Sequence, residues 1–127
     1  MNATELAAIV ATVILALLIC FQILLVLGLP LGRVAWGGQH SVLPTKLRWG
    51  SLAAVVILGV AAWIVLARAD LVAPGDEPLA IRITTWIFAG YWVLNTFGNI
   101  VSKSPTERYV MTPVSVLLIA CFVVVSL

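Results

Sequence analysis

The sequence predicts an all-α fold, a four-helix transmembrane up-and-down bundle that forms one domain of 127 residues. Hydrophobic residues make up 63% of the chain and charged residues 9%, whereas soluble domains average about 45–50% and 25%. Four uncharged stretches, 6–32, 49–67, 83–102 and 109–127, each contain at least 19 residues, and about 20 helical residues cross a bilayer. These stretches do not alternate between polar and apolar residues, as membrane strands of about 10 residues do.

The signals at the ends of these stretches predict spans over about 4–29, 45–68, 79–102 and 106–127. Gly28 and Pro30 mark the end of the first helix, and Pro44 is a favourable residue at the start of the second. The polar segment 70–78 is expected to form the turn between the second and third helices. The first stretch has no basic segment before it and no A-x-A cleavage site after it, which favours an uncleaved span over a signal peptide.

The fourth helix has a distinct start. Ser104, Pro105 and Glu107 match a capping box with proline at the first helical position. Pro113 then lies inside the helix, where it leaves the carbonyl of Tyr109 without its usual donor. We therefore expect a kink or a local unwinding between Tyr109 and Pro113.

The basic residues predict the orientation of the chain in the membrane. Five of them flank the first and third connections: Arg33, Lys46, Arg48, Lys103 and Arg108. Only Arg68 and Arg82 flank the second connection, and neither terminus carries a lysine or arginine. Because cytoplasmic loops are enriched in basic residues, loops 30–44 and 102–106 are expected in the cytoplasm and both termini outside.

The first loop is a candidate site for an anion or a lipid headgroup. Backbone N–H groups of a Gly37–Gly38 turn can point at an anion, and arginine can bind phosphate through two hydrogen bonds. The candidate residues are Arg33, Gly37, Gly38, Gln39, His40, Lys46 and Arg48. The alternative is a tight interfacial turn whose basic residues only anchor the chain, with His40 as a hydrogen-bonding loop residue.

A second candidate site is a polar cluster near the same end of the bundle. Asn95 and Asn99 lie four residues apart, on one face of the third helix. The predicted cluster consists of Asn95, Asn99, Ser102, Glu107 and Arg108. Amides inside a membrane hydrogen-bond between helices, so the cluster is either structural or the lining of a cytoplasmic cavity that Gln22, Arg33 and His40 also face.

The residue types present argue against chemistry on a bound substrate. His40 is the only histidine, and no cysteine or carboxylate lies near it in the sequence, whereas metal sites generally need several such ligands. Cys20 and Cys121 lie at different depths in separate predicted helices, which argues against a disulfide. We expect no catalytic residue, no metal, no cofactor and no nucleic-acid partner.

The two halves of the chain share a pattern that is consistent with duplication or with chance. Gly28 precedes Arg33 by five residues, as Gly98 precedes Lys103. Pro-Thr then begins each following helix, at 44–45 and at 105–106. If the halves are repeats, the first loop contains an insertion that includes the Gly37–Gly38 pair.

Residues in both cytoplasmic loops resemble those of a family of short bacterial four-helix integral membrane proteins with no assigned activity. These residues are Gly32, Arg33, Trp36 to His40, Leu43, Pro44, Arg48, Gly98, Asn99, Ser102, Ser104, Glu107 and Arg108. The resemblance implies the inner membrane of a bacterium and brings no substrate.

From the sequence we expect a small non-enzymatic accessory or assembly protein of the membrane. Its partners would be membrane lipid and either further copies of itself or a larger membrane complex. The alternative is an oligomeric small transporter, channel or lipid-binding membrane protein.

Overall fold

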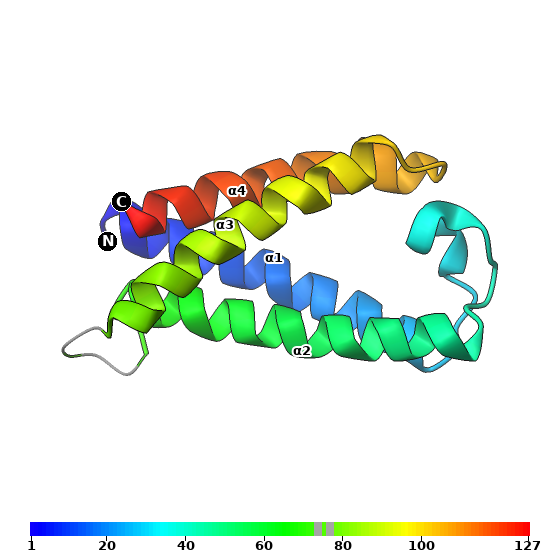
Figure 1. Cartoon of the computed structure of the whole chain (residues 1–127), viewed down its shortest axis with the longest axis horizontal. Helices are drawn as coiled ribbons and strands as arrows, with labels where there is room; N and C mark the ends of the chain where they lie inside the picture. The colour runs from blue at the N-terminus through cyan, green and yellow to red at the C-terminus, as the bar shows by residue number, and fades with distance from the viewer. Residues whose placement is uncertain (73–74, 76–77) are drawn as a thin grey trace.

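The computed structural model describes residues 1–72, 75 and 78–127, and it contains four α-helices that run alternately up and down (Figure 1). The helices are α1 (Ala3–Val26), α2 (Thr45–Arg68), α3 (Leu79–Ile100) and α4 (Thr112–Ser126). Both termini lie at the end of the bundle that carries the α2–α3 connection (Figure 1). The predicted all-α bundle is therefore confirmed. Residues 73, 74, 76 and 77 of the expected turn 70–78 lie outside the described residues.

Three helical segments are long and apolar enough to cross a membrane: Ala3–Val26, Thr45–Arg68 and Glu107–Ser126. They identify the chain as a membrane protein. The helix α3 has 22 residues but does not belong to this set. It carries Asn95, Asn99 and three threonines among its apolar residues, and the two asparagines line the cavity described below.

Helix α1 ends three residues before the predicted boundary at 29 because a glycine reverses the chain. Gly28 has φ +86°, a left-handed conformation that glycine adopts without strain. The N–H of Leu29 donates to the carbonyl of Leu24 at 3.2 Å, and the N–H of Gly28 donates to that of Leu25 at 3.1 Å. This pair of hydrogen bonds is a Schellman motif, which satisfies carbonyls that the helix leaves free.

The start of the fourth helical segment matches the sequence. The chain is helical from Pro105, and the Ser104 Oγ accepts a hydrogen bond from the Glu107 N–H at 3.4 Å. A π-helical turn, η3 (Glu107–Met111), follows and widens the helix just before Pro113. The expected local disruption ahead of that proline is therefore present as a π-turn.

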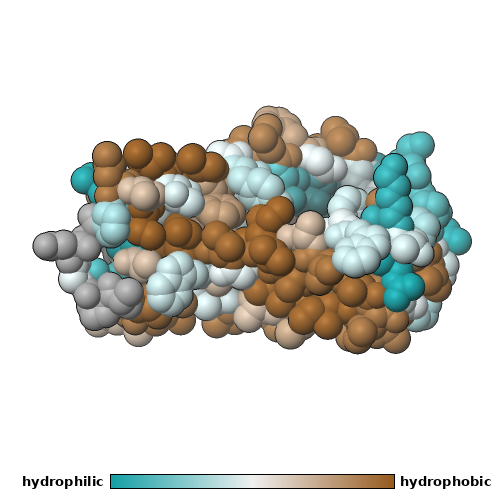
Figure 2. All heavy atoms as spheres, turned by 60° about the horizontal axis from the view of Figure 1, so that its bottom comes forward, coloured by the Kyte–Doolittle hydropathy of each residue, from teal (hydrophilic) through white to brown (hydrophobic). Residues whose placement is uncertain are grey.

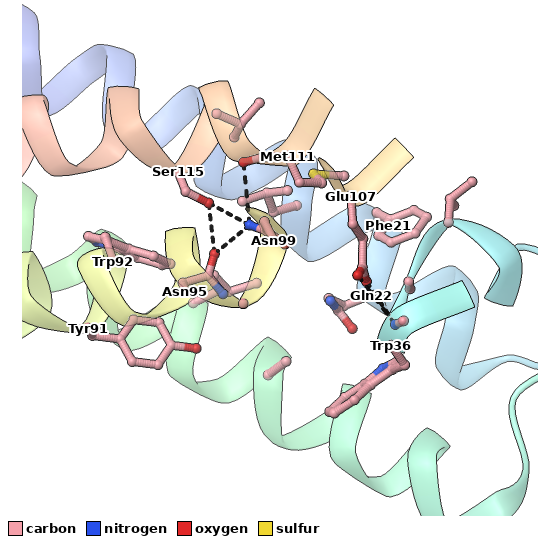
Figure 3. A pocket seen from close by; sticks show the side chains of 18 residues that line it. Phe21, Gln22, Trp36, Tyr91, Trp92, Asn95, Asn99, Glu107, Met111 and Ser115 are labelled. Carbon is pink, nitrogen blue, oxygen red and sulfur yellow. Dashed lines mark hydrogen bonds between the residues drawn. The ribbon is translucent and has the colours of Figure 1, made fainter. Parts of the chain in front are cut away.

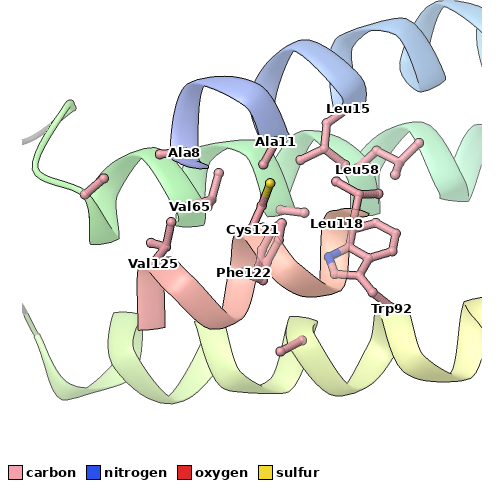
Figure 4. Packing of buried hydrophobic residues seen from close by; sticks show 13 residues of the cluster. Ala8, Ala11, Leu15, Leu58, Val65, Trp92, Leu118, Cys121, Phe122 and Val125 are labelled. Atoms are coloured by element: carbon pink, nitrogen blue, oxygen red, sulfur yellow. The ribbon is translucent and has the colours of Figure 1, made fainter. Parts of the chain in front are cut away.

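The helices form two hairpins, α1–α2 and α3–α4, and α1 also packs along α4. Figure 1 shows the hairpins closest near the termini and further apart toward the opposite end. Near the termini, small and apolar side chains pack between the helices in one buried cluster (Figure 4). Ala8, Ala11 and Val65 are fully buried there, and so is Phe122, whose ring lies 5.8 Å from that of Trp92.

The connection between α1 and α2 folds back toward the space between the hairpins at their wide end (Figure 1). It contains two short 3-10 turns, η1 (Gly32–Val34) and η2 (Trp36–Gly38). Leu43 and Ala35 are buried with Leu25 in a small second core that holds the connection against α1. We call residues 31–43 the capping loop.

Candidate functional site

A cavity of about 360 Å³ lies between the two hairpins, beneath the capping loop. Residues from all four helices, the η3 turn and the loop line it (Figure 3). Tyr91, Asn95 and Trp36 line the cavity and are also exposed, so it is open to the surface. Figure 2 shows hydrophilic atoms recessed between hydrophobic ones on the face where α2 comes forward.

Three polar side chains on α3 and α4 form a closed hydrogen-bond triangle on one wall of the cavity (Figure 3). The Asn99 Nδ2 donates to the Asn95 Oδ1 at 3.1 Å and to the Ser115 Oγ at 2.8 Å. The Ser115 hydroxyl donates to the same Asn95 oxygen at 2.8 Å. The triangle joins the two helices of the second hairpin and leaves the Asn95 Nδ2 available at the exposed rim.

The capping loop enters the cavity through an unusual turn. Trp36, Gly37 and Gly38 have φ values of +50°, +79° and +74°, so three successive residues adopt the left-handed conformation. The left-handed conformation costs a residue with a side chain, such as Trp36, about 1–2 kcal/mol. The Trp36 indole N–H donates to the Ser51 Oγ at 3.0 Å. A Cβ at Gly50 would lie 2.9 Å from the Trp36 ring, so α2 can accept this ring only because position 50 is glycine.

The α3–α4 connection holds the tip of this turn in place. The Gly37 N–H points at the Glu107 carboxylate, with both oxygens 3.3 Å from the nitrogen, and the Ser102 hydroxyl donates to the same carboxylate. The Ser104 hydroxyl donates to the Arg33 carbonyl at 3.0 Å. These contacts join segments about 70 residues apart in the sequence.

Gly38 allows the two connections to approach this closely. A Cβ at Gly38 would lie 2.9 Å from the Arg33 carbonyl oxygen and 3.0 Å from the Ser104 Cβ. Ser104 itself is buried, and its N–H donates to the Ser102 Oγ at 3.0 Å. The predicted capping box is thus extended by Ser102, which lies between the Ser104 N–H and the Glu107 carboxylate.

The cavity presents acceptors that the protein does not fully satisfy. Among the described lining residues, Glu107 is the one with a charged side chain. The Gln22 Oε1 is buried without a hydrogen-bond partner, and Gln22 and Glu107 point into the same end of the cavity (Figure 3). The Trp92 Nε1 is also buried without a partner, within the apolar core. Unpaired buried polar atoms are uncommon and call for an explanation.

The residues predicted to bind an anion differ in their surroundings. Arg33, Gln39, His40 and Lys46 are exposed. The Arg48 Nε instead donates to the Val26 carbonyl at 2.9 Å, at the end of α1. The Gly37 N–H does face an anion, but this anion is the chain's own Glu107.

The predicted polar cluster is divided between the cavity wall and the loop contact. Asn95 and Asn99 belong to the triangle, whereas Ser102 and Glu107 belong to the contact with the capping loop. Arg108 lies outside the cavity and donates to the Ser102 carbonyl at 2.8 Å. Three participants are not among the site residues predicted from the sequence: Trp36, Ser51 and Ser115. Ser115 carried one signal, a polar side chain in an otherwise apolar helix.

Neither a metal-ligating group nor the predicted His40 belongs to the cavity lining in the part of the chain that the structure describes. No group of three or more His, Cys, Asp and Glu residues there could hold a metal ion. His40 is exposed on the loop and does not line the cavity.

Comparisons with known proteins add no family to these observations. No family model, no curated protein and no solved structure significantly matches this chain.

Proposed function

We propose that this protein is a small integral membrane carrier or transporter that binds a small organic solute in the cavity between its two hairpins. The observation that carries the proposal is the cavity itself, with its volume of about 360 Å³. Ligand sites in proteins are typically concave, mostly apolar and about 300–1,000 Å³ in volume, with a few polar groups that fix orientation. The Asn95–Asn99–Ser115 triangle and Glu107 supply those groups.

The proposal includes four membrane passes, with α3 as the fourth. A helix of 22 residues is about 33 Å long, which matches a hydrocarbon core of about 30 Å. Its amides are tolerable in the membrane because they hydrogen-bond to each other and to Ser115. We place loops 30–44 and 102–106 in the cytoplasm of a bacterium and both termini outside, on the strength of the basic residues near those loops.

The closed end of the bundle defines what transport would require. Beyond the cavity, a cluster of buried apolar side chains lies between the helices near the termini. A solute could cross only if the hairpins moved relative to each other, and the main contacts between the capping loop and the second hairpin involve Ser104 and Glu107. A homo-oligomer would be compatible with this motion. Its additional interfaces would lie on the lipid-facing surfaces.

The competing proposal is an accessory or assembly protein whose cavity has no ligand. Native mass spectrometry of the protein purified in mild detergent separates the two ideas. A retained small molecule supports a binding protein, whereas a retained foreign subunit with an empty cavity supports the accessory role.

Solute binding is tested by thermal unfolding of the purified protein with a panel of small cationic, neutral and anionic organic solutes. We expect at least one class to raise the midpoint in the wild-type protein and to lose this effect in the Asn95→Ala/Asn99→Ala double variant. Thr84→Ala is the matched control on α3, because the Thr84 hydroxyl only bonds back to the Ala80 carbonyl, at 2.6 Å. No stabilisation by any solute would contradict the proposal.

A further inference from the structure

The charge of the cavity is negative and comes from one side chain. The described lining residues include no lysine, arginine or histidine, and Glu107 supplies their one charge. The basic residues near this end lie elsewhere: Arg33, Lys46, Lys103 and Arg108 are exposed, and Arg48 is hydrogen-bonded at the end of α1. Because the lining supplies one negative charge and no positive charge, this cavity disfavours anions.

The Glu107 carboxylate keeps the capacity to accept more hydrogen bonds. Both of its oxygens lie 3.3 Å from the Gly37 nitrogen, whereas charge-assisted N–H···O bonds are about 2.7–2.9 Å long. The Gly37 N–H is thus divided between two long hydrogen bonds, one to each oxygen of the Glu107 carboxylate. The carboxylate has no ion-pair partner in the described part of the chain, and a ligand with stronger donors would compete with Gly37.

A second acceptor lies toward the same end. The Gln22 Oε1 is buried and has no hydrogen-bond partner, although leaving such an atom unpaired is energetically unfavourable. Gln22 and Glu107 come from different hairpins and point into one part of the cavity (Figure 3). A donor-bearing group placed there reaches Glu107, and it pairs with Gln22 once the amide turns its buried oxygen toward the cavity.

The walls beyond these acceptors are apolar and aromatic. Phe21, Trp36, Tyr91 and Trp92 line the cavity, together with aliphatic side chains such as Leu18 and Leu58. Aromatic faces attract cations within about 6 Å of the ring centre, and Trp and Tyr do so strongly. Aliphatic and aromatic walls also bury the apolar part of a ligand.

We infer that the cavity binds a hydrophobic organic cation, specifically a protonated amine with an apolar or aromatic body. The inference rests on the proposed function and names its ligand class. The ammonium group donates to the Glu107 carboxylate and the Gln22 oxygen, and the body lies toward Leu18, Leu58 and Trp92. Tyr91 and Trp36 at the exposed side contact the ligand near the opening.

The test uses three probes of similar shape and different charge: 1-naphthylmethylammonium, neutral 1-naphthylmethanol and anionic 1-naphthoate. Binding is measured by isothermal titration calorimetry on the wild-type protein in nanodiscs of zwitterionic lipid, with empty nanodiscs as the blank. We expect saturable binding of the cation that is about tenfold tighter or more than that of the neutral probe. We expect no measurable binding of the anion.

Two test substitutions, each with its own control, connect the preference for the cation to Glu107 and Tyr91. Glu107→Gln removes the charge but keeps an oxygen that can accept from Gly37 and Ser102, and it should abolish the tenfold preference. Glu5→Gln, at the start of α1 and away from the cavity, is the matched control and should retain it. Tyr91→Leu should weaken cation binding about threefold because it removes an aromatic wall near the opening, whereas Tyr109→Leu, which does not line the cavity, should not.

The outcomes separate this inference from the proposed function. Equal binding of the cation and the neutral probe, or tighter binding of the anion, overturns the cation assignment and leaves a solute-binding protein. A cation preference that survives Glu107→Gln in a folded protein overturns the assignment of Glu107. If none of the three probes binds and no other solute stabilises the protein, both proposals fail. Since the probe series uses the wild-type chain, it decides the ligand class even if a variant does not fold.

Discussion

The two ends of this bundle are built from the same four helices and have opposite characters. Near the termini, alanines and one large aromatic ring, Phe122, close the space between the hairpins. Near the capping loop, amides, a serine and a carboxylate line a cavity at the corresponding position. Small residues let helices approach closely in lipid, whereas polar side chains require partners and space. The difference shows how one helical framework can confine its polar chemistry to one end.

The largest effect on stability is expected at the closed end. Phe122→Ala removes a fully buried ring that contacts Phe88 and Trp92, with centroid distances of 6.1 and 5.8 Å. We expect a loss of about 3 kcal/mol in the free energy of unfolding, the lower end of the range for such changes, because lipid weakens the transfer contribution. Unfolding in mixed micelles with increasing dodecyl sulfate measures it. Leu117→Ala is the control, because Leu117 is exposed on the same helix, and it should change the free energy of unfolding little. Equal losses of stability in the Phe122→Ala and Leu117→Ala variants would contradict the packing described for this end.

An intermediate effect is expected where the capping loop meets α2. Gly50→Ala places a methyl group 2.9 Å from the Trp36 ring, so the ring and its turn must move. We expect a loss of about 2 kcal/mol, as for overpacked sites. Gly59→Ala is the control, because a Cβ there meets nothing within 4 Å; it should be neutral or stabilise α2 by up to about 1 kcal/mol. The same unfolding measurement applies, and tryptophan fluorescence follows the displacement of Trp36. Identical behaviour of the two variants would contradict the docked position of the loop.

The smallest effect is expected in the cavity wall. Ser115→Ala removes one corner of the triangle with Asn95 and Asn99. Hydrogen bonds between membrane helices contribute about 0.6 kcal/mol on average, and we expect a loss of that size. Ser126→Ala on the same helix should have no effect, because that hydroxyl only bonds back to the Phe122 carbonyl. Solute binding provides the second measurement: Ser115→Ala should weaken it and Ser126→Ala should not.

The positions of the helices could be predicted almost completely from the sequence. The contacts that form the site could be predicted only in small part. Hydropathy and terminal signals located the four helices to within a few residues, because a membrane dictates both their length and their apolar character. Two local features were also predictable from the sequence, the Ser104–Glu107 cap and the disruption before Pro113, because both depend only on residues adjacent in the chain.

The contacts that build the cavity depend instead on how the hairpins pack. Gly37 was interpreted as part of an anion site and Glu107 as part of a separate polar cluster, yet the structure places the two in contact. Neither the sequence around Gly37 nor the sequence around Glu107 indicates that these two residues contact each other. Trp36 illustrates the same limit: its sequence position fits an interfacial anchor, whereas its indole N–H is bonded to Ser51 inside the bundle.

The docking of the capping loop also has a consequence for biosynthesis. During synthesis α1, the loop and α2 emerge first, and the Gly37 N–H and the Arg33 carbonyl then lack Glu107 and Ser104, which belong to a part of the chain not yet made. The left-handed turn at Trp36 therefore reaches its final position only after the segment that carries Ser104 and Glu107 has been made. The cavity between the hairpins is then completed in the last step of assembly.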